Sequence, residues 1–409
     1  MPAKPQYEII VYGATSFVGQ ILSRYLQENY GKDGDLKWAI AGRSASKLEA
    51  VKRDIAAPDL PMIVADASDR AALDGMVKQT KVIISTVGPY ALYGDDVVAA
   101  CVANGNDYCD LTGESQWMRK MIDAHQAEAE KTGARIVHNC GFDSIPSDMG
   151  LMYTQQQAKK TLGETCSKVS LRVKAMKGAA SGGTVASLLN VVKEASKDAG
   201  LRKELQNPYS VAPEGMRSGP RQPDTNMTGY DKVANSWIAP FVMAAINTRV
   251  IQRSHALLGR PWGENFMYDE ATLMGDGVKG RAAALGMTAG LGGFVAAAAV
   301  TPARTMLEKY VLPKPGEGPS PEAQEKGFFD LRLYGTTDSG KTIVTKVTGD
   351  KDPGYGSTAK MLGESGLCLA RDVTRRSVKG GFWTPSTALG EKLLKRLEAN
   401  AGLTFTTLS

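Results

Sequence analysis

The chain has 409 residues, of which 43% are hydrophobic and 22% charged, and its 49 basic and 43 acidic residues leave a net charge of +6. This composition is that of a globular protein of two or three domains, and it excludes a disordered chain, a collagen and a disulfide scaffold. The charge is too mild to predict nucleic-acid binding. Five scattered cysteines are accompanied by only three histidines. We therefore expect reduced thiols, no metal site and a cytoplasmic protein.

The first 140 residues alternate apolar, strand-like runs with segments of helical periodicity. The runs lie at residues 8–12, 36–41, 61–65, 82–86, 108–111 and 135–138. Ser46, followed three residues later by Glu49, has the pattern of a capping box and predicts the start of the second helix. Strands that alternate with helices form a parallel sheet with helices on both faces. We therefore predict an α/β fold whose N-terminal domain, residues 1–150, is a Rossmann-type doubly wound parallel sheet.

A glycine-containing turn, Gly13-Ala-Thr-Ser-Phe-Val-Gly19, joins the first predicted strand to the first helix. Its spacing is that of a dinucleotide-binding turn, with Ser16 at the place of a middle glycine. In such turns the first glycine allows the sharp bend, the small middle residue lets the backbone approach the pyrophosphate, and the last lets helix and strand pack closely. The phosphates bind the free N–H groups of the helix N-terminus. The predicted cofactor contacts here are Gly13, Thr15, Ser16, Phe17, Val18 and Gly19.

The second predicted strand ends at Gly42-Arg43-Ser44, whereas NAD enzymes usually carry an acidic residue at this place. A guanidinium matches the geometry of phosphate oxygens, so Arg43 can stack on the adenine and bind a 2′-phosphate. Ser44 and Lys47 lie next to it in the chain. We therefore predict NADP(H) as the cofactor. The alternative is that Arg43 is a solvated loop residue.

The third and fourth predicted strands end at the carboxyl edge of the sheet, where ligands of open α/β sheets bind. Asp66 follows the third strand, and we predict that it flanks the adenine. The fourth strand is followed by a turn that we predict to shape the backbone near the nicotinamide. Its residues are Thr86, Val87, Gly88 and Pro89. For each of these residues an ordinary loop role is the alternative.

The alternation of strands and helices stops after the first domain. Residues 169–176 alternate like a strand, and residues 328–334 and 342–347 alternate like the two strands of a hairpin. We predict a second, α+β domain over residues 151–350 that serves substrate binding or formation of a homodimer. Residues 351–409 are predicted to form helices that pack back on the first domain.

Residues 282–303 form a stretch of twenty-two residues without a charge. Its length suffices to cross roughly 30 Å of hydrocarbon, but alanine and glycine dominate it and Pro302 interrupts its end. Two interpretations rank equally: a surface helix that touches a membrane or an acyl chain, and a buried core helix. A membrane-spanning helix ranks below both. We therefore expect at most a peripheral contact with a membrane through residues 282–303.

Eight short motifs are spread along almost the whole chain. They run from Tyr12 to Gly19, Ala41 to Ser44, Val87 to Tyr90, Tyr108 to Glu114, Gly141 to Asp148, Gly182 to Thr184, Asp352 to Lys360 and Gly381 to Pro385. Together they resemble the saccharopine dehydrogenase-like oxidoreductases, and within them the trans-acting enoyl reductase branch. The resemblance implies NADPH-dependent reduction of a carbon–carbon double bond in a lipid or polyketide acyl chain. The substrate is then a small molecule or is bound to a carrier.

Hydride transfer to an enoyl group needs a residue that stabilises the developing enolate or supplies a proton. Tyr90 is the first candidate because it directly follows Gly88 and Pro89. Other candidates near the same edge of the sheet are Tyr93, Asp110, Glu114, Asp143 and Ser144. For each candidate, a hydrogen bond that stabilises a loop is the alternative role.

Three functional interpretations remain. The first is a reductase of a lipid-like acyl substrate. The second is a saccharopine-type amino-acid oxidoreductase, which must bind dicarboxylates with arginines such as Arg172, Arg249 and Arg253. The third is a non-catalytic, NADPH-binding protein associated with a membrane. The uncharged stretch at 282–303 favours the first interpretation over the second.

Overall fold

The computed structural model describes residues 5–31, 34–178, 182–310 and 318–409. The chain divides into two compact units. The first contains residues 1–142, 316–318 and 354–401, and the second contains residues 143–315, 319–353 and 402–409. Both units are therefore built from segments that are separated in the sequence, and the last residues of the chain belong to the second unit.

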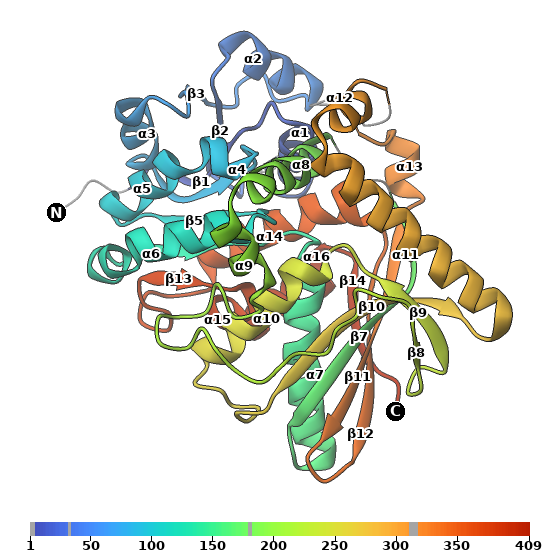
Figure 1. The fold of residues 1–409 in the computed structure, drawn as a ribbon. Coiled ribbons are helices and arrows are strands. Elements are labelled where there is room, and N and C mark those ends of the chain that lie inside the picture. The colour runs from blue at the N-terminus through green and yellow to red at the C-terminus, as the bar shows by residue number, and fades with distance from the viewer. Residues whose placement is uncertain (1–4, 32–33, 179–181, 311–317) are drawn as a thin grey trace. The chain divides into compact units, whose positions relative to one another are not determined.

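The first unit is built on a parallel sheet (Figure 1). Its strands, in the residues described, lie in the order β13 (Gly381–Trp383), β6 (Arg135–Val137), β5 (Asp107–Asp110), β4 (Thr80–Ser85), β1 (Tyr7–Tyr12), β2 (Trp38–Gly42) and β3 (Met62–Val64). The order reverses between β1 and β4, which is the point where open α/β sheets bind ligands at their carboxyl edge. Every residue of β2 is buried, as expected for a strand covered on both faces.

Helices from both ends of the chain cover this sheet. The N-terminal ones are α1 (Phe17–Leu26), α2 (Ala45–Asp54), α3 (Arg70–Val77), α4 (Tyr90–Tyr93), α5 (Asp95–Asn104) and α6 (Ser115–Thr132). The C-terminal ones are α14 (Thr358–Arg371), α15 (Pro385–Ala388) and α16 (Gly390–Asn400). Helix α14 packs against β1, β4, β5 and α1, whereas α3, α5 and α6 pack side by side. The predicted Rossmann-type fold is confirmed.

The second helix begins earlier than its sequence pattern predicts. Ser44, and not Ser46, is the N-cap of α2, and its hydroxyl accepts a hydrogen bond from the backbone N–H of Lys47 at 3.4 Å. The predicted capping box from Ser46 to Glu49 is therefore wrong. Strand β2 ends at Gly42, so an extended Ser44 is free to cap the helix. The Ser46 hydroxyl instead lies 3.2 Å from that of Ser44.

The second unit contains a mixed sheet. Its strands, within the described residues, lie in the order β14 (Leu403–Thr407), β12 (Thr342–Gly349), β11 (Phe328–Thr337), β7 (Cys166–Lys177), β10 (Met267–Gly275), β9 (Ser236–Pro240) and β8 (Gly229–Asp231). Strands β7 and β10 are parallel, and the other pairs are antiparallel. Strands β11 and β12 form the predicted hairpin, with alternating burial that marks one face of the sheet as core.

The helices of the second unit are α7 (Ile145–Leu162), α8 (Gly182–Lys197), α9 (Ala199–Gln206), α10 (Ala244–Leu257), α11 (Gly277–Ala299), α12 (Thr301–Tyr310) and α13 (Pro321–Glu325). Helix α7 packs on β7, β11, β12 and β14, and α10 packs on α7 and β10. Helix α11 contacts β9, β10, α8 and α12. The predicted α+β character of this part of the chain is confirmed.

Candidate functional site

The turn after β1 requires glycine at both of its ends. Gly13 has a φ of +89°, and a Cβ atom there would lie 2.7 Å from Cγ2 of Val87. A Cβ atom at Gly19 would lie 2.2 Å from the carbonyl oxygen of Gly13. Both positions therefore exclude a side chain, because the turn packs closely against the end of β4 and against the start of α1.

Ser16 fixes the turn instead of providing the space of a middle glycine. It is the N-cap of α1, and its hydroxyl accepts a hydrogen bond from the backbone N–H of Gly19 at 3.0 Å. The same hydroxyl lies 2.9 Å from Oγ1 of Thr86, which in turn donates to the carbonyl of Gly13 at 2.9 Å. These bonds join the ends of β1 and β4, the two strands at the reversal point.

The N-terminus of α1 presents donors suited to an anion. Phe17 and Val18 are the first helical residues, and backbone N–H groups at such positions have no partner within a helix. The ring of Phe17 packs edge-on against Tyr355, with centroids 4.9 Å apart. A Cβ atom at Gly318 would lie 2.4 Å from the Phe17 ring. Segments far apart in the chain therefore hold the start of α1.

Arg43 lies at the end of β2 as an exposed side chain. Within the described residues no hydrogen bond or ion pair holds its guanidinium. The Asp66 carboxylate accepts hydrogen bonds from the backbone N–H and the hydroxyl of Ser68, at 3.0 and 2.7 Å. These bonds, with the charge of Arg43, lower the pKa of Asp66. Asp66 thus stabilises its own turn beside a positive charge.

These residues fit NADP(H). The tight turn between Gly13 and Gly19 leads directly into α1, whose first N–H groups lack partners within the helix and are suited to bind a pyrophosphate. The unpaired guanidinium of Arg43 and the exposed ammonium of Lys47 lie at the end of the neighbouring strand. A phosphate on the adenosine ribose requires such cations.

Tyr90 and Glu114 form a buried pair below the turn at Thr86–Pro89. The Tyr90 hydroxyl donates to the carbonyl of Ser85 at 3.0 Å. The two carboxylate oxygens of Glu114 accept the backbone N–H groups of Tyr90 and Ala91, at 2.8 and 2.9 Å. Both side chains therefore hold the short helix α4 at the end of β4. The assignment of Tyr90 as the proton donor stays a prediction.

Asp110 joins the ends of β5 and β6. One of its carboxylate oxygens lies 2.7 Å from Nδ1 of His138, and the other accepts the backbone N–H groups of Thr112 and Asn139. Asp110 and His138 are fully buried. Sequence patterns single out Asp110 but not His138, because their pairing depends on two strands 28 residues apart.

Asp143 and Ser144, at the start of the second unit, differ in their partners. The Ser144 hydroxyl donates to Oδ1 of Asn247 at 3.0 Å, and the amide of Asn247 donates to the buried Glu270. Asp143 is half-buried, and in the part of the chain described its carboxyl makes no hydrogen bond or ion pair. Burial raises the pKa of Asp143 to about 7. It is thus a carboxylic acid able to carry a proton near neutral pH.

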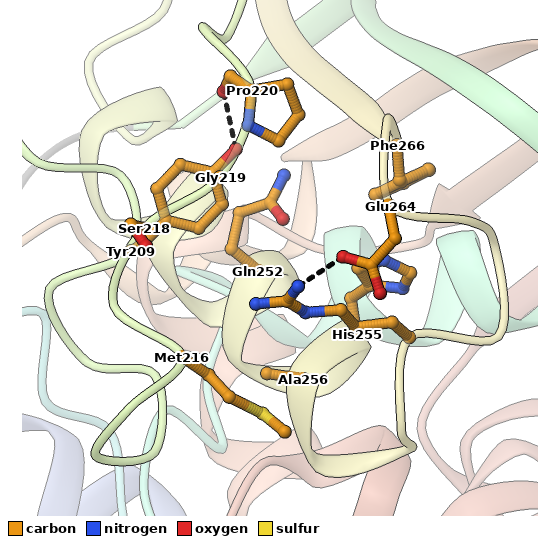
Figure 2. Close-up of a pocket in the computed structure, with 11 residues that line it drawn as sticks. Tyr209, Met216, Ser218, Gly219, Pro220, Gln252, His255, Ala256, Glu264 and Phe266 are labelled. Carbon is orange, nitrogen blue, oxygen red and sulfur yellow. Dashed lines mark hydrogen bonds and ion pairs between the residues drawn. The ribbon is translucent and has the colours of Figure 1, made fainter.

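Two hollows lie in the second unit. The first has a volume of about 10 Å³ (Figure 2), which is about enough for one water molecule. The second has a volume of about 480 Å³ and is lined by Met152, Gln155, Gln156, Lys159, Lys160, Thr165, Leu258 and Trp262. No residue predicted from the sequence to bind the cofactor lines either hollow. Helix α8 begins at the family motif Gly182–Thr184, whose side chains lie outside the described residues.

Comparison with known proteins agrees with this site. The family described as "Saccharopine dehydrogenase NADP binding domain" matches residues 9–137. A protein of Mycobacterium tuberculosis strain H37Rv, provisionally named a trans-acting enoyl reductase, is 39% identical over 100% of this chain and 99% of its own. The trans-acting enoyl reductase of Mycobacterium ulcerans is 37% identical over 97% of this chain and 96% of its own.

Two solved structures share the fold at low sequence identity. Apo saccharopine dehydrogenase (L-Glu forming) from Saccharomyces cerevisiae has a TM-score of 0.50 and 14% identity, covering 98% of this chain and 100% of its own. Homospermidine synthase from Legionella pneumophila, in complex with NAD, has a TM-score of 0.53 and 9% identity, covering 98% and 92%. These likenesses concern the fold alone.

Fold, turn and comparisons together define an NADP-dependent oxidoreductase with a saccharopine dehydrogenase-type cofactor domain. The predicted cofactor is confirmed. Within this class, the chain belongs to the trans-acting enoyl reductase family.

Proposed function

We propose that the protein reduces the carbon–carbon double bond of an enoyl group in an acyl substrate, presented as a small thioester or on a carrier. The relatives named trans-acting enoyl reductases align over nearly their whole length with this chain, beyond the cofactor domain. This coverage supports a shared substrate class, since the part that does not bind NADP is shared as well.

The bonds and the burial of three arginines favour an acyl substrate over an amino-acid substrate. Arg172 forms ion pairs with Asp231 and Asp269, both at 2.5 Å. The guanidinium of Arg249 donates to the carbonyls of Ala245 and Leu205, and that of Arg253 donates to the carbonyl of Val211. All three are buried. Each guanidinium is thus buried and bound to a carboxylate or a carbonyl of the protein itself, so none of the three is exposed to clamp a dicarboxylate.

NADPH, when bound, supplies the hydride. The backbone of Gly13 to Gly19 and the N-terminus of α1 would hold the pyrophosphate, and Arg43 with Lys47 would neutralise the 2′-phosphate. Thr86 holds the turn after β4 through its bonds to Gly13 and Ser16. Together these residues would bind the cofactor at the carboxyl edge of the sheet, beside the reversal point between β1 and β4.

A proton must also reach the α-carbon of the substrate, and Asp143 is suited to deliver it. It follows β6 by six residues, just after Phe142, whose backbone N–H donates to Thr358 at the start of α14. Its carboxyl is free of protein partners in the residues described, unlike Tyr90, Asp110, Glu114 and Ser144. A general acid with a pKa near 7 matches the working pH of such a step.

The test is NADPH consumption by the full chain with two substrate panels. The first contains trans-2-enoyl thioesters of increasing chain length, both small and carrier-bound. The second contains 2-oxo acids with amino-acid amines. We expect turnover with the first panel and none with the second. Activity with the second panel alone contradicts the proposal in favour of an amino-acid oxidoreductase, and activity with neither panel despite tight NADPH binding supports a non-catalytic protein.

A further inference from the structure

Helix α11 is apolar and exposed, a combination that a surface helix normally avoids. It runs over Gly277–Ala299, and only Gly280, Ala284 and Ala298 are buried. The exposed side chains include Leu285 at 52% and Val295 at 48% of full exposure. An ordinary surface helix places charged and polar residues on its outer face. The interpretation of residues 282–303 as a core helix is therefore wrong.

The outer face of α11 is smooth as well as apolar. Cβ atoms built at Gly286, Gly290, Gly292 and Gly293 meet no atom within 4 Å. The inner face is held by a few contacts, among them the hydroxyl of Thr288, which lies 2.8 Å from that of Thr228. Near the other end Ala298 packs with Leu189 and Val192 of α8. The helix is therefore fixed to its own unit along one side only.

Both ends of α11 attach to the same fold, which excludes a membrane span. Strand β10 ends at Gly275 just before the helix, and the chain returns through α12 to β11 in the same sheet (Figure 1). A helix that crossed a bilayer would place strands of one sheet on opposite sides of it. At roughly 34 Å for 23 residues, α11 instead offers a long apolar ridge along the surface.

Cations lie at both ends of α11. Near its start the Arg281 guanidinium lies 5.3 Å from the ring centre of Trp237. At its end the guanidinium of Arg304, from α12, donates to the carbonyl of Ala298 at 3.3 Å. From residue 277 to 310 the sequence has four basic residues and one acidic residue. Aromatic and basic side chains of this kind favour the headgroup level of a membrane.

We infer that α11 and the start of α12 dock onto the surface of a membrane containing anionic lipid, with the outer face of α11 in the acyl boundary. The charge pattern favours lipid over a second copy of the chain. In a two-fold pair of α11 helices, parallel or antiparallel, the basic ends of one helix meet basic ends of the other. The phosphate headgroups of anionic lipids carry the opposite charge and can pair with these basic ends.

The test is flotation of the full chain, without detergent, with vesicles of phosphatidylcholine and phosphatidylglycerol or of phosphatidylcholine alone. We expect binding to the mixed vesicles. The double variant Leu285→Ser, Val295→Ser is expected to bind at least tenfold more weakly. The double variant Lys279→Gln, Arg281→Gln is expected to bind mixed vesicles about 30-fold more weakly, with little change on phosphatidylcholine alone.

The matched control is Val242→Ser with Leu258→Ser, which removes equally exposed apolar side chains outside α11 and is expected to bind like the wild type. NADPH affinity, unchanged in every variant, shows that folding is intact. Absence of vesicle binding by the wild type overturns the inference, as does equal binding by all variants. A dimer in solution that the Leu285→Ser, Val295→Ser variant loses, without vesicle binding, assigns the ridge to a second copy and also overturns it.

Discussion

At the scale of single residues, some positions of the site are predictable from their neighbours in the sequence. Others depend on a partner that lies far away in the sequence. Gly13, Gly19 and Arg43 are predictable because the turn and the strand end that require them lie in one short segment. The bond between the hydroxyls of Ser16 and Thr86 is not, because these two residues are 70 positions apart in the sequence. The same holds for Tyr355, whose packing on Phe17 gives a role to the motif at 352–360 that the sequence left unexplained.

We propose that Arg43 determines the preference for NADPH over NADH. Replacement of Arg43 by Asp removes the cation at the 2′-phosphate and adds a repelling charge, so we expect the preference for NADPH over NADH to fall about 100-fold. Fluorescence titration of both cofactors measures the ratio. Arg53→Asp is the matched control, since Arg53 is an exposed arginine in the last turn of α2. An unchanged ratio in Arg43→Asp contradicts the assignment.

If Asp143 is the proton donor, its replacement lowers kcat strongly, whereas replacement of Tyr90 changes kcat little. Asp143→Asn is expected to lower kcat by about 100-fold or more, and to remove the fall in wild-type kcat as pH rises through about 7. Tyr90→Phe loses the hydrogen bond to the carbonyl of Ser85 and the longer one, at 3.4 Å, from the backbone N–H of Leu111. We therefore expect about 1–2 kcal/mol less stability and kcat within about threefold of wild type.

The pH dependence of thermal stability provides a control for the Asp143→Asn variant. Burial raises the pKa of Asp143 from the ordinary value of 3.8 to about 7 in the folded chain. Between these two pH values the folded chain keeps a proton that the unfolded chain has lost, so the stability of the fold decreases as the pH rises. Asp143→Asn should therefore be more stable than the wild type at pH 8 by thermal melting, and not at pH 4. A large loss of kcat in Tyr90→Phe, with Asp143→Asn near wild type, reverses the assignment.

At the scale of secondary-structure elements, long periodic segments were predictable and short ones with distant partners were not. The six N-terminal strands and the β11–β12 hairpin follow from apolar alternation and from turns between neighbours in sequence. Strand β13 has three residues, and its Gly381 pairs with Arg135 of β6. Strands β8 and β9 are similarly short. Tertiary pairing, rather than local propensity, determines such strands.

Helix α10 carries a pH-sensitive packing site in the small hollow of Figure 2. The ring of His255 stacks on Trp262 with centroids 4.9 Å apart, and its Nε2 lies 3.0 Å from the carbonyl of Gly263. Burial lowers the pKa of His255 to about 4. Between about pH 6.5 and pH 4 the unfolded chain binds a proton that the folded chain excludes, so stability falls as the pH falls.

Replacement of His255 by Phe tests this packing site. The variant should lose less stability than the wild type between pH 7 and pH 4.5, by about 1–2 kcal/mol after allowance for solvent screening. Urea unfolding at both pH values measures the difference. Parallel stability curves for the two proteins would show that His255 titrates equally in the folded and unfolded chains.

At the scale of the whole molecule, the cofactor unit depends on the end of the chain. Glu364 of α14 accepts hydrogen bonds from Tyr25 and Tyr30 near α1 and pairs with Arg396 of α16. Arg135 of β6 donates to the carbonyl of Val373. The N-terminal 142 residues therefore lack part of their own core without the C-terminal segment.

Two shortened chains test this dependence. A chain ending at Lys351 loses α14, β13 and α16, and we expect it to lose cooperative unfolding and NADPH binding. A chain ending at Ala401 loses only β14, an edge strand of the other unit, and should keep NADPH binding. Calorimetry and cofactor titration distinguish the two. NADPH binding by the chain ending at Lys351 would contradict the shared core.

We propose above all that the protein reduces an enoyl group with NADPH. Its most direct test is a single-turnover reaction of the full chain with NADPH deuterated at the transferred position and a trans-2-enoyl thioester, followed by mass spectrometry of the product. We expect a saturated acyl thioester with one deuterium at its β-carbon, and far less product with NADH. Deuterium recovered only in a secondary amine, from a 2-oxo acid and an amino acid, would contradict it.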